Sequence, residues 1–355
     1  MSTAARRQGL VETLVDAELE GILVTTLVNV RYLTGFTGSN GALLVLREGS
    51  AVFFTDGRYR DQAAKELPDM EHVITRDLVA GAAERMTEGA WGIETHTLSV
   101  DAYGRLAELL PNATLVPAER VVETLRVVKD DAEIDRLRTA CDISTKALDG
   151  LLAGPLLGRT EREVARDLEG RMLDLGAEAI AFETILASGE NSAIPHHRPT
   201  DRVLKLGDFV KADFGARVDG YHADCTRTVV LGSADDWQRE IYAAVRESQA
   251  AGLEAFREGV PVAESDVAAR ASLEAAGWLH AFTTGLGHGV GLEIHEDPFI
   301  AARHTGKLCS RTVLTMEPGI YVPGRGGVRI EDTVLVTTGA PEVLTTMTKE
   351  LMEIG

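Results

Sequence analysis

The chain has 355 residues, 45% of them hydrophobic and 26% charged, which is typical of a globular protein with more than one domain. Its formal net charge is -19 at pH 7, and such an acidic surface repels phosphate backbones, so we expect no nucleic-acid partner. No apolar stretch is long enough to cross a membrane, and three widely spaced cysteines without a CxxC pair form no disulfide framework. We therefore expect a cytoplasmic protein with no membrane partner.

The first third of the chain alternates helical and strand patterns. Residues 5–19 have helical spacing and lack the apolar run of a secretory signal. The patterns that follow predict strands at 21–25, 42–48 and 51–56, a helix at 58–67, short strands near Val73 and Trp91, and a helix at 101–110. Strands separated by helices are typical of an α/β domain, which we place at residues 1–126.

A region of different character follows, and it begins with a long helical pattern at residues 130–152. We place the domain boundary just before this helix, near Arg126. Further helices are predicted after Thr160, which forms a capping-box pattern with Glu163, and at about 235–257 and 265–276. Long strand runs lie among these helices, so residues 127–355 are predicted to form an α+β domain. Seven of the nine histidines lie in this part, which indicates that the chemistry is here.

The segment FVKADFGARVDGYHADCTRTVVL carries the first pair of candidate functional carboxylates. Asp219 and Gly220 lie between two alternating runs and form a strong hairpin turn signal. In a hairpin with that two-residue loop, Asp224 lies opposite Gly215, and Asp213 is its diagonal neighbour on the same face. The flanking residues are apolar, so the two carboxylates are expected to be buried, where they repel each other unless something positive lies between them.

A second segment, TVLTMEPGIYVPGRGGVRIEDTVLV, repeats this geometry. Its strand-like ends surround a turn, and Glu317 and Glu331 are each seven residues from Gly324. A hairpin centred there brings the two glutamates roughly opposite each other. Four carboxylates that meet in one buried site are unstable without cations, and two divalent metals resolve the repulsion.

A histidine is expected from the segment GLGHGVGLEIHEDP. His288, Val290 and Leu292 alternate as in a strand, and the glycines between them allow close backbone packing. His295 has the opposite parity. The sequence offers no support for other chemistry, because Phe299 stands where an HExxH motif needs its second histidine and no GxSxG elbow occurs.

Taken in order, the segments SGENSAIPHHRP, DFGARVDGYHADCTRT, GLGHGVGLEIHEDP, MEPGIY and GVRIED resemble those of the Xaa-Pro peptidases, the group of prolidase and aminopeptidase P. NVRYLTGFTGSNGALLV and TDGRYRDQA resemble the N-terminal domain of that family, so the resemblance covers nearly the whole chain. It implies a creatinase-like α/β N-terminal domain, residues 1–126, followed by an α+β catalytic domain of the pita-bread fold, residues 127–355. Methionine aminopeptidase and creatinase share that catalytic fold.

The resemblance also implies a metal site with two divalent ions, usually manganese, with cobalt or zinc as alternatives. The implied ligands are Asp213, Asp224, His288, Glu317 and Glu331. Asp224 and Glu331 would bridge both ions, Asp213 would complete one site, and His288 with Glu317 would complete the other. Creatinase lacks this ligand set, so a metal-free activity of the creatinase kind is disfavoured.

Three further residues take roles from the resemblance. His196 and His295 are expected at the substrate, and His295 would stabilise the developing oxyanion. Arg329 belongs to the family's RIED run, where it would contact the substrate side of the site and orient a bridging carboxylate. Glu317 would accept the proton of the attacking water. His197 has no assigned role, and Tyr221 and His222 are expected to be structural.

The predicted function is metal-dependent hydrolysis of the peptide bond that precedes proline in small peptides, by a homodimer. An Xaa-Pro bond is a tertiary amide without an N–H, so it calls for a dedicated enzyme. One alternative is an exopeptidase of the methionine aminopeptidase kind, which usually lacks the N-terminal domain. Another is a non-catalytic peptide-binding protein of the same fold, which would lose metal ligands. Whether the substrate is a dipeptide or a longer peptide stays open.

Overall fold

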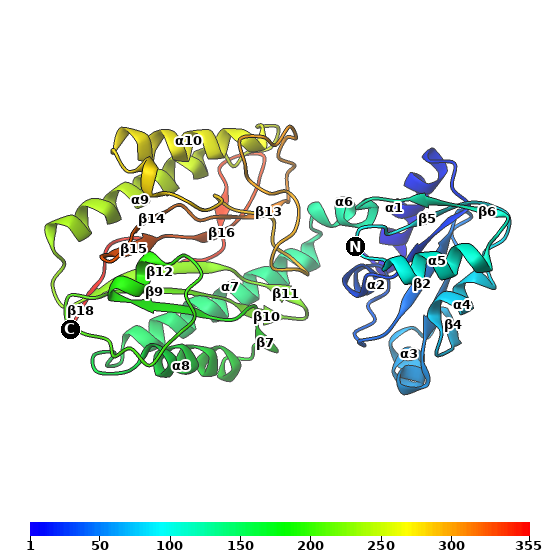
Figure 1. The fold of residues 1–355 in the computed structure, drawn as a ribbon, viewed down its shortest axis with the longest axis horizontal. Coiled ribbons are helices and arrows are strands. Elements are labelled where there is room, and N and C mark those ends of the chain that lie inside the picture. The colour runs from blue at the N-terminus through cyan, green and yellow to red at the C-terminus, as the bar shows by residue number, and fades with distance from the viewer. The chain divides into compact units, whose positions relative to one another are not determined.

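The computed structural model describes all 355 residues and divides into two compact units, Met1–Arg126 and Val127–Gly355. The first unit is built on a six-stranded sheet with the order β4-β3-β2-β1-β5-β6 (Figure 1). Its strands are β1 (Gly21–Val24), β2 (Ala42–Leu46), β3 (Ala51–Thr55), β4 (Glu71–Ile74), β5 (Gly89–Ile93) and β6 (Ala113–Pro117). Strand β2 is antiparallel to both of its neighbours, and all the other pairs of adjacent strands are parallel.

Helices alternate with these strands along the chain, and several of them pack on the sheet. They are α1 (Thr3–Asp16), α2 (Leu27–Thr34), α3 (Arg60–Glu66), α4 (Leu78–Ala83), α5 (Val100–Leu109) and α6 (Val121–Val127). Helices α1 and α2 contact each other and the central strands, whereas α4 packs on β3 and on α5. Leu44 and Phe54 of the sheet are fully buried together with Leu106 of α5, so this unit has a core of its own. The sequence patterns had not indicated α2, α4, α6 or β6.

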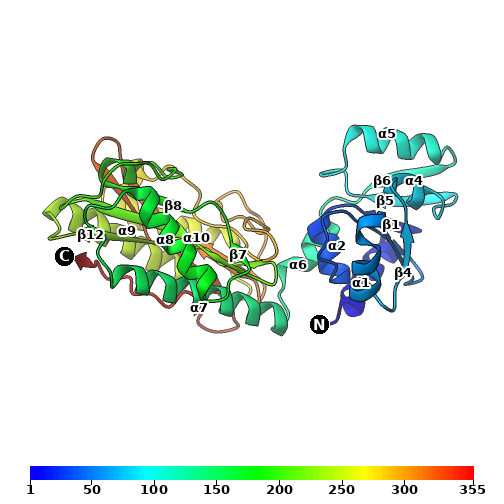
Figure 2. The same ribbon diagram turned by 90° about the horizontal axis from the view of Figure 1, so that it is seen from below.

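The second unit places its strands between two pairs of helices (Figures 1 and 2). Helices α7 (Asp131–Leu152) and α8 (Glu161–Asp174) pack together, and so do α9 (Asp236–Glu254) and α10 (Val262–Ala275). One apolar cluster joins the first pair to strands β9 and β12, and a second joins the other pair to the strands after residue 313. None of the helices combines the length and the apolar character that crossing a membrane requires.

The strands of the second unit form four small sheets. Their orders are β18-β12-β9-β8, β13-β16-β17, β14-β15 and β11-β10-β7. The strands are β7 (Ala179–Ile180), β8 (Ile185–Ser188), β9 (Phe209–Phe214), β10 (Ala216–Val218), β11 (Tyr221–His222), β12 (Cys225–Leu231), β13 (Val313–Met316), β14 (Gly319–Val322), β15 (Gly326–Arg329), β16 (Asp332–Leu335), β17 (Glu342–Val343) and β18 (Glu353–Ile354). The predicted capping box of Thr160 and Glu163 begins α8 as expected.

Both predicted hairpin registers are confirmed. Asp219 and Gly220 take φ of 48° and 82°, as a two-residue turn of the favoured hand requires, and Val218 pairs with Tyr221. The same register continues into β9 and β12, where Asp213 lies opposite Thr226.

In the second hairpin, pairs on both sides of the two glutamates share one register. Gly319 pairs with Arg329, and Met316 pairs with Asp332. Glu317 and Glu331 lie between these pairs, each at the point where one short strand ends and the next begins. The two carboxylates are therefore opposite each other, as predicted.

The strand expected at His288–Leu292 is not formed. The segment runs beside β13 and exchanges hydrogen bonds with it, such as Thr315 N to His288 O at 2.8 Å, but Gly289 makes only isolated bridges, to Leu314 and to Glu296. The reason is that the chain reverses after Gly291, so that residues 296–298 lie on one side of Gly289 and β13 lies on the other. A Cβ atom at Gly289 would collide with the Asp297 carbonyl, so glycine is required there.

Candidate active site

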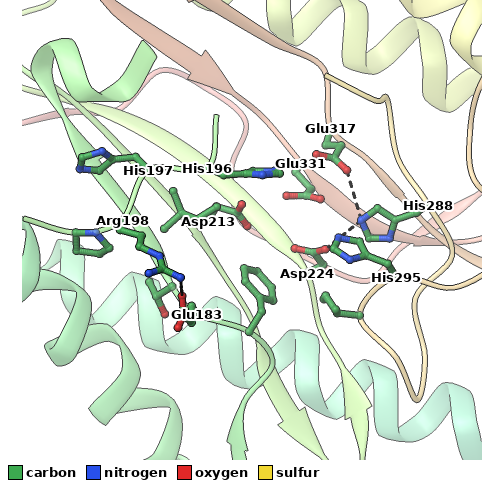
Figure 3. Close-up of a pocket in the computed structure, with 15 residues that line it drawn as sticks. Glu183, His196, His197, Arg198, Asp213, Asp224, His288, His295, Glu317 and Glu331 are labelled. Atoms are coloured by element: carbon green, nitrogen blue, oxygen red, sulfur yellow. Dashed lines mark ion pairs between the residues drawn. The ribbon is translucent and has the colours of Figure 1, made fainter. Parts of the chain in front are cut away.

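A cavity of about 360 Å³ opens in the second unit, and all of the predicted site residues except Arg329 line it (Figure 3). It is lined by Phe182, Glu183, Thr184, Ile185, His196, His197, Arg198, Pro199, Asp213, Asp224, His288, Ile294, His295, Glu317 and Glu331. All five predicted metal ligands are in this set, together with His196 and His295. The structure thus brings together segments that are more than 100 residues apart in the chain.

The four carboxylates are held at strand ends. Asp213 belongs to β9, and Asp224 lies directly before β12. Glu317 follows β13, and Glu331 lies directly before β16. A bridge between Thr226 and Glu331 brings the two hairpins side by side, so all four carboxylates face one space.

The distances in this cluster suit a bound cation. The His288 Nε2 atom is 3.5 Å from Asp224 Oδ2 and 3.5 Å from Glu317 Oε1. Ligand atoms of one cation each lie about 2.0–2.2 Å from it, and so roughly 3.0–3.5 Å from one another. One ligand atom each from Asp224, His288 and Glu331 lies within 4.8 Å of the others. The Asp213 Oδ1 atom is buried and has no hydrogen-bond partner, as expected of a ligand atom.

The electrostatics of the cluster also favour a bound cation. Burial, followed by the charges of neighbouring carboxylates, holds the pKa of Asp224 and of Glu331 well above the usual range. Burial also raises the pKa of Glu317 to about 7. Ionising these three buried carboxyl groups together is costly for the protein alone, and divalent cations relieve that cost. The residues present therefore fit a metal pair.

His288 is prepared to act as a neutral ligand. Burial lowers the pKa of His288 to about 4. Its Nδ1 atom lies 3.0 Å from the Gly289 carbonyl oxygen and donates to it in the tautomer that leaves Nε2 unprotonated. Nε2 is the atom that faces Asp224 and Glu317. A backbone contact thus fixes which ring nitrogen is presented to a cation.

Arg329 lies behind the carboxylates. Its side chain is buried, and its guanidinium donates to Asp213 Oδ2, to the Thr226 hydroxyl at 2.9 Å and to the Tyr321 hydroxyl at 2.8 Å. We had expected Arg329 to orient a bridging carboxylate and to contact the substrate. Its direct carboxylate partner is instead Asp213, and it is not among the residues that line the cavity. It reaches Glu331 only through Thr226, whose hydroxyl donates to Glu331 Oε2 at 2.6 Å.

Two buried ionisable side chains, which the sequence reasoning missed, hold the loop that carries His196. Lys211 of β9 is fully buried, and its Nζ atom donates to the carbonyl oxygens of Ser192 at 3.0 Å and Ile194 at 2.8 Å. Burial holds the pKa of Lys211 well below the usual range. The only signal in the sequence was a charged residue inside the apolar run of β9.

The second anchor explains His197. The carboxylate of Glu161, at the start of α8, is fully buried and accepts from His197 Nε2 at 2.8 Å, from the Thr200 hydroxyl at 2.6 Å and from the Ser188 backbone N–H at 2.7 Å. Burial opposes ionisation, but the hydrogen bonds from Thr200, Asn191 and His197 outweigh it and lower the pKa of Glu161 to about 2. His197 is therefore an anchor, whereas the preceding residue, His196, is exposed in the cavity.

His295 lies beside His288 at the cavity (Figure 3). The two ring centroids are 4.3 Å apart and the rings are nearly perpendicular. Burial, and then the nearby His196, lower the pKa of His295. The following residue, Glu296, forms a buried ion pair of 2.5 Å with Lys129, which lies two residues before the start of α7. This ion pair fixes the turn that presents His295.

Tyr221 and His222 have the structural roles expected of them. The Tyr221 hydroxyl donates to Glu133 Oε1 of α7 at 2.9 Å. His222 Nδ1 lies 3.0 Å from the Gly291 carbonyl oxygen, and burial lowers the pKa of His222. Both residues tie the first hairpin to its neighbours.

The family comparisons agree with this site. The model of metallopeptidase family M24 matches residues 135–338, and that of the Creatinase/Prolidase N-terminal domain matches residues 6–128. An Xaa-Pro dipeptidase of Pyrococcus furiosus is 35% identical over 349 residues, which are 98% of this chain and 99% of that protein.

Solved structures show the same likeness. An Xaa-Pro dipeptidase from Bacillus anthracis is 36% identical, with a TM-score of 0.94 over 99% of this chain and 100% of the other. An X-Pro aminopeptidase from Thermotoga maritima is 32% identical, with a TM-score of 0.91 over 98% of this chain and 99% of the other. The two are thus nearly equal in their likeness to this chain.

A buried set of carboxylates with one neutral histidine, carried on paired hairpins below an open cavity, defines a metal-dependent hydrolase. The chain belongs to metallopeptidase family M24, with a creatinase/prolidase-type domain before the catalytic domain. The resemblance to the Xaa-Pro peptidases and the fold it implied are confirmed.

Proposed function

We propose that this protein hydrolyses the peptide bond preceding proline in small peptides, with two divalent cations as cofactors. The observation that carries the proposal is the convergence of four carboxylates and His288 Nε2 at the floor of one open cavity. The names of the similar proteins, an Xaa-Pro dipeptidase and an X-Pro aminopeptidase, support the substrate class. Manganese is the cation we propose first, with cobalt or zinc as alternatives, and we propose a cytoplasmic homodimer, both by resemblance to the family.

The proposed metal ligands divide into three groups. Asp224 and Glu331 would be shared by both ions, Asp213 would serve one ion, and His288 and Glu317 would serve the other. When bound, the cations would make a water nucleophilic at neutral pH and polarise the substrate carbonyl.

The protein supplies the remaining steps. Glu317 is the least buried of the four carboxylates, so it is the one best placed to take the proton of the attacking water and pass it to the departing prolyl nitrogen. His295 would donate to the carbonyl oxygen as negative charge develops there. His196, on the other wall, would contact the prolyl residue.

The test compares the metal-reconstituted protein with a variant in one ligand. Asp224→Asn keeps the shape of the side chain but removes a shared carboxylate. We expect it to lower kcat/KM for Leu-Pro by about 1,000-fold or more, because several kcal/mol of transition-state stabilisation depend on the metal pair. Metal content is measured in parallel by atomic emission.

The matched control is Asp219→Asn, which changes an exposed aspartate in the turn of the same hairpin. Asparagine is a favoured residue in two-residue hairpin turns of this type, so this variant should keep full activity. Full activity of Asp224→Asn with metal present would contradict the ligand assignment. A wild-type protein that binds metal but cleaves Leu-Ala as readily as Leu-Pro would contradict the proline specificity.

A further inference from the structure

One side chain that lines the cavity carries a permanent positive charge, and the proposed reaction gives it no role. Arg198 is the only arginine or lysine among the residues that line the cavity. Its side chain is 86% exposed and forms an ion pair of 3.2 Å with Glu183, which is 82% exposed. In the view of Figure 3 this pair lies on the side of the cavity away from His288. An ion pair so exposed contributes little to stability, so the arginine is free to exchange its partner at small cost.

Hydrogen bonds hold the backbone around Arg198, whereas its side chain is exposed. Glu161 holds His197 on one side and both the N–H and the hydroxyl of Thr200 on the other. His197 points into the protein, and the residues on each side of it, His196 and Arg198, are exposed. One anchored turn thus presents an imidazole and a guanidinium to the same cavity.

A substrate that ends at proline places a charge in this cavity. One residue separates the scissile bond from the terminal carboxylate, which is a span of roughly 3.5 Å along the chain. The other ionised side chains that line the cavity are carboxylates, which have no hydrogen bond to donate to such an end. A guanidinium binds a carboxylate through two parallel hydrogen bonds, and Arg198 is the only side chain in the lining with this capacity.

We propose that Arg198 is the residue that binds the C-terminal carboxylate of an Xaa-Pro dipeptide, by leaving Glu183 for the substrate. The inference rests on the proposed function and adds substrate length to it. Arg198 favours a dipeptide, because the carboxylate of a tripeptide lies one residue further from the metal cluster.

The experiment measures kcat and KM for Leu-Pro, Leu-Pro-amide and Leu-Pro-Gly with the manganese-loaded full chain. For Arg198→Ala we expect KM for Leu-Pro to rise about 10-fold or more, with kcat within about twofold of wild type. Kinetics with Leu-Pro-amide, which has no terminal charge, should not change. Arg198→Lys, which keeps the charge but loses the paired hydrogen bonds, should recover part of the lost affinity.

The control is Arg162→Ala, which removes an equal charge from a neighbouring exposed arginine that does not line the cavity. It should leave KM for Leu-Pro unchanged. The inference is overturned if Arg198→Ala affects the acid and the amide equally, if Arg162→Ala reproduces the loss, or if only Leu-Pro-Gly is affected. Absence of cleavage of all three peptides by the wild-type enzyme would instead contradict the proposed function.

Discussion

Asp224 shows how burial and neighbouring charges act together on one carboxyl group of the site. Burial raises its pKa, and the charges of Glu331, Asp213 and Glu317 raise it further. Arg329 acts in the other direction, but it is already engaged with Asp213. A protein without metal therefore keeps protons in this cluster at a pH where ordinary carboxyl groups have lost them.

This retention predicts an unusual pH dependence for the metal-free protein. The folded pKa of Glu317, about 7, exceeds its ordinary value of 4.5, so between these values the folded state binds more protons than the unfolded state. The free energy of unfolding must then fall as the pH rises through that window. We expect the melting temperature of the metal-stripped protein to be several degrees lower at pH 8 than at pH 5.

Calorimetry after chelation measures this difference directly. Added manganese should remove or reverse it, because deprotonated ligands bind the cation more tightly at higher pH. A metal-stripped protein whose melting temperature rises from pH 5 to pH 8 would show that the cluster is not protonated as the burial implies.

At the scale of the elements, the two hairpins were predictable because turn chemistry and strand alternation are local. Asp219 and Gly220 set the register of Asp213 and Asp224, and the centre at Gly324 set that of the two glutamates. The segment of His288 was not predictable in the same way. Its alternation is that of a strand, but contacts from distant residues on both sides of Gly289 determine its path.

The buried charges behind the site were also beyond sequence reasoning. Lys211 and Glu161 look like ordinary charged residues in a strand and at a helix start. Their roles depend on the carbonyls and side chains of a loop that returns to them from elsewhere in the chain. His197 could be assigned only when its partner was known.

Lys211 offers a test of how this loop is held. In Lys211→Met the apolar stem remains, but the carbonyls of Ser192 and Ile194 lose their donor. An unsatisfied buried polar group costs about 1–3 kcal/mol, so we expect kcat/KM for Leu-Pro to fall by roughly 10- to 100-fold through displacement of His196.

A double-mutant cycle with His196→Ala separates this positioning role from general damage. If Lys211 acts through His196, Lys211→Met should change kcat/KM by less than about threefold in the His196→Ala background. Additive losses would contradict the positioning role. Circular dichroism and metal content of all four proteins show whether each is folded and loaded.

At the scale of the whole molecule, the division into two compact units has a thermodynamic consequence. Each unit has its own apolar core, and every proposed metal ligand belongs to the second. We propose that the units, residues 1–126 and 127–355, unfold as separate cooperative domains. Scanning calorimetry should then resolve two transitions, and manganese should raise the temperature of only one, because a ligand stabilises the domain that binds it.

The assignment of the transitions can be checked with Asp224→Asn, in which the metal-dependent shift should be lost while the other transition stays in place. A single transition that moves as a whole with manganese would contradict independent domains.

The ion pair of Lys129 and Glu296 bears on where the catalytic machinery begins in the chain. Lys129 lies only two residues after the start of the second unit and before its first long helix, yet it neutralises a carboxylate more than 160 residues away, next to His295. A protein engineer who trimmed the chain to begin at Asp131, a natural choice because α7 starts there, would leave Glu296 buried without this cation. The short segment before α7, which looks like a linker, thus helps to hold the residue next to His295.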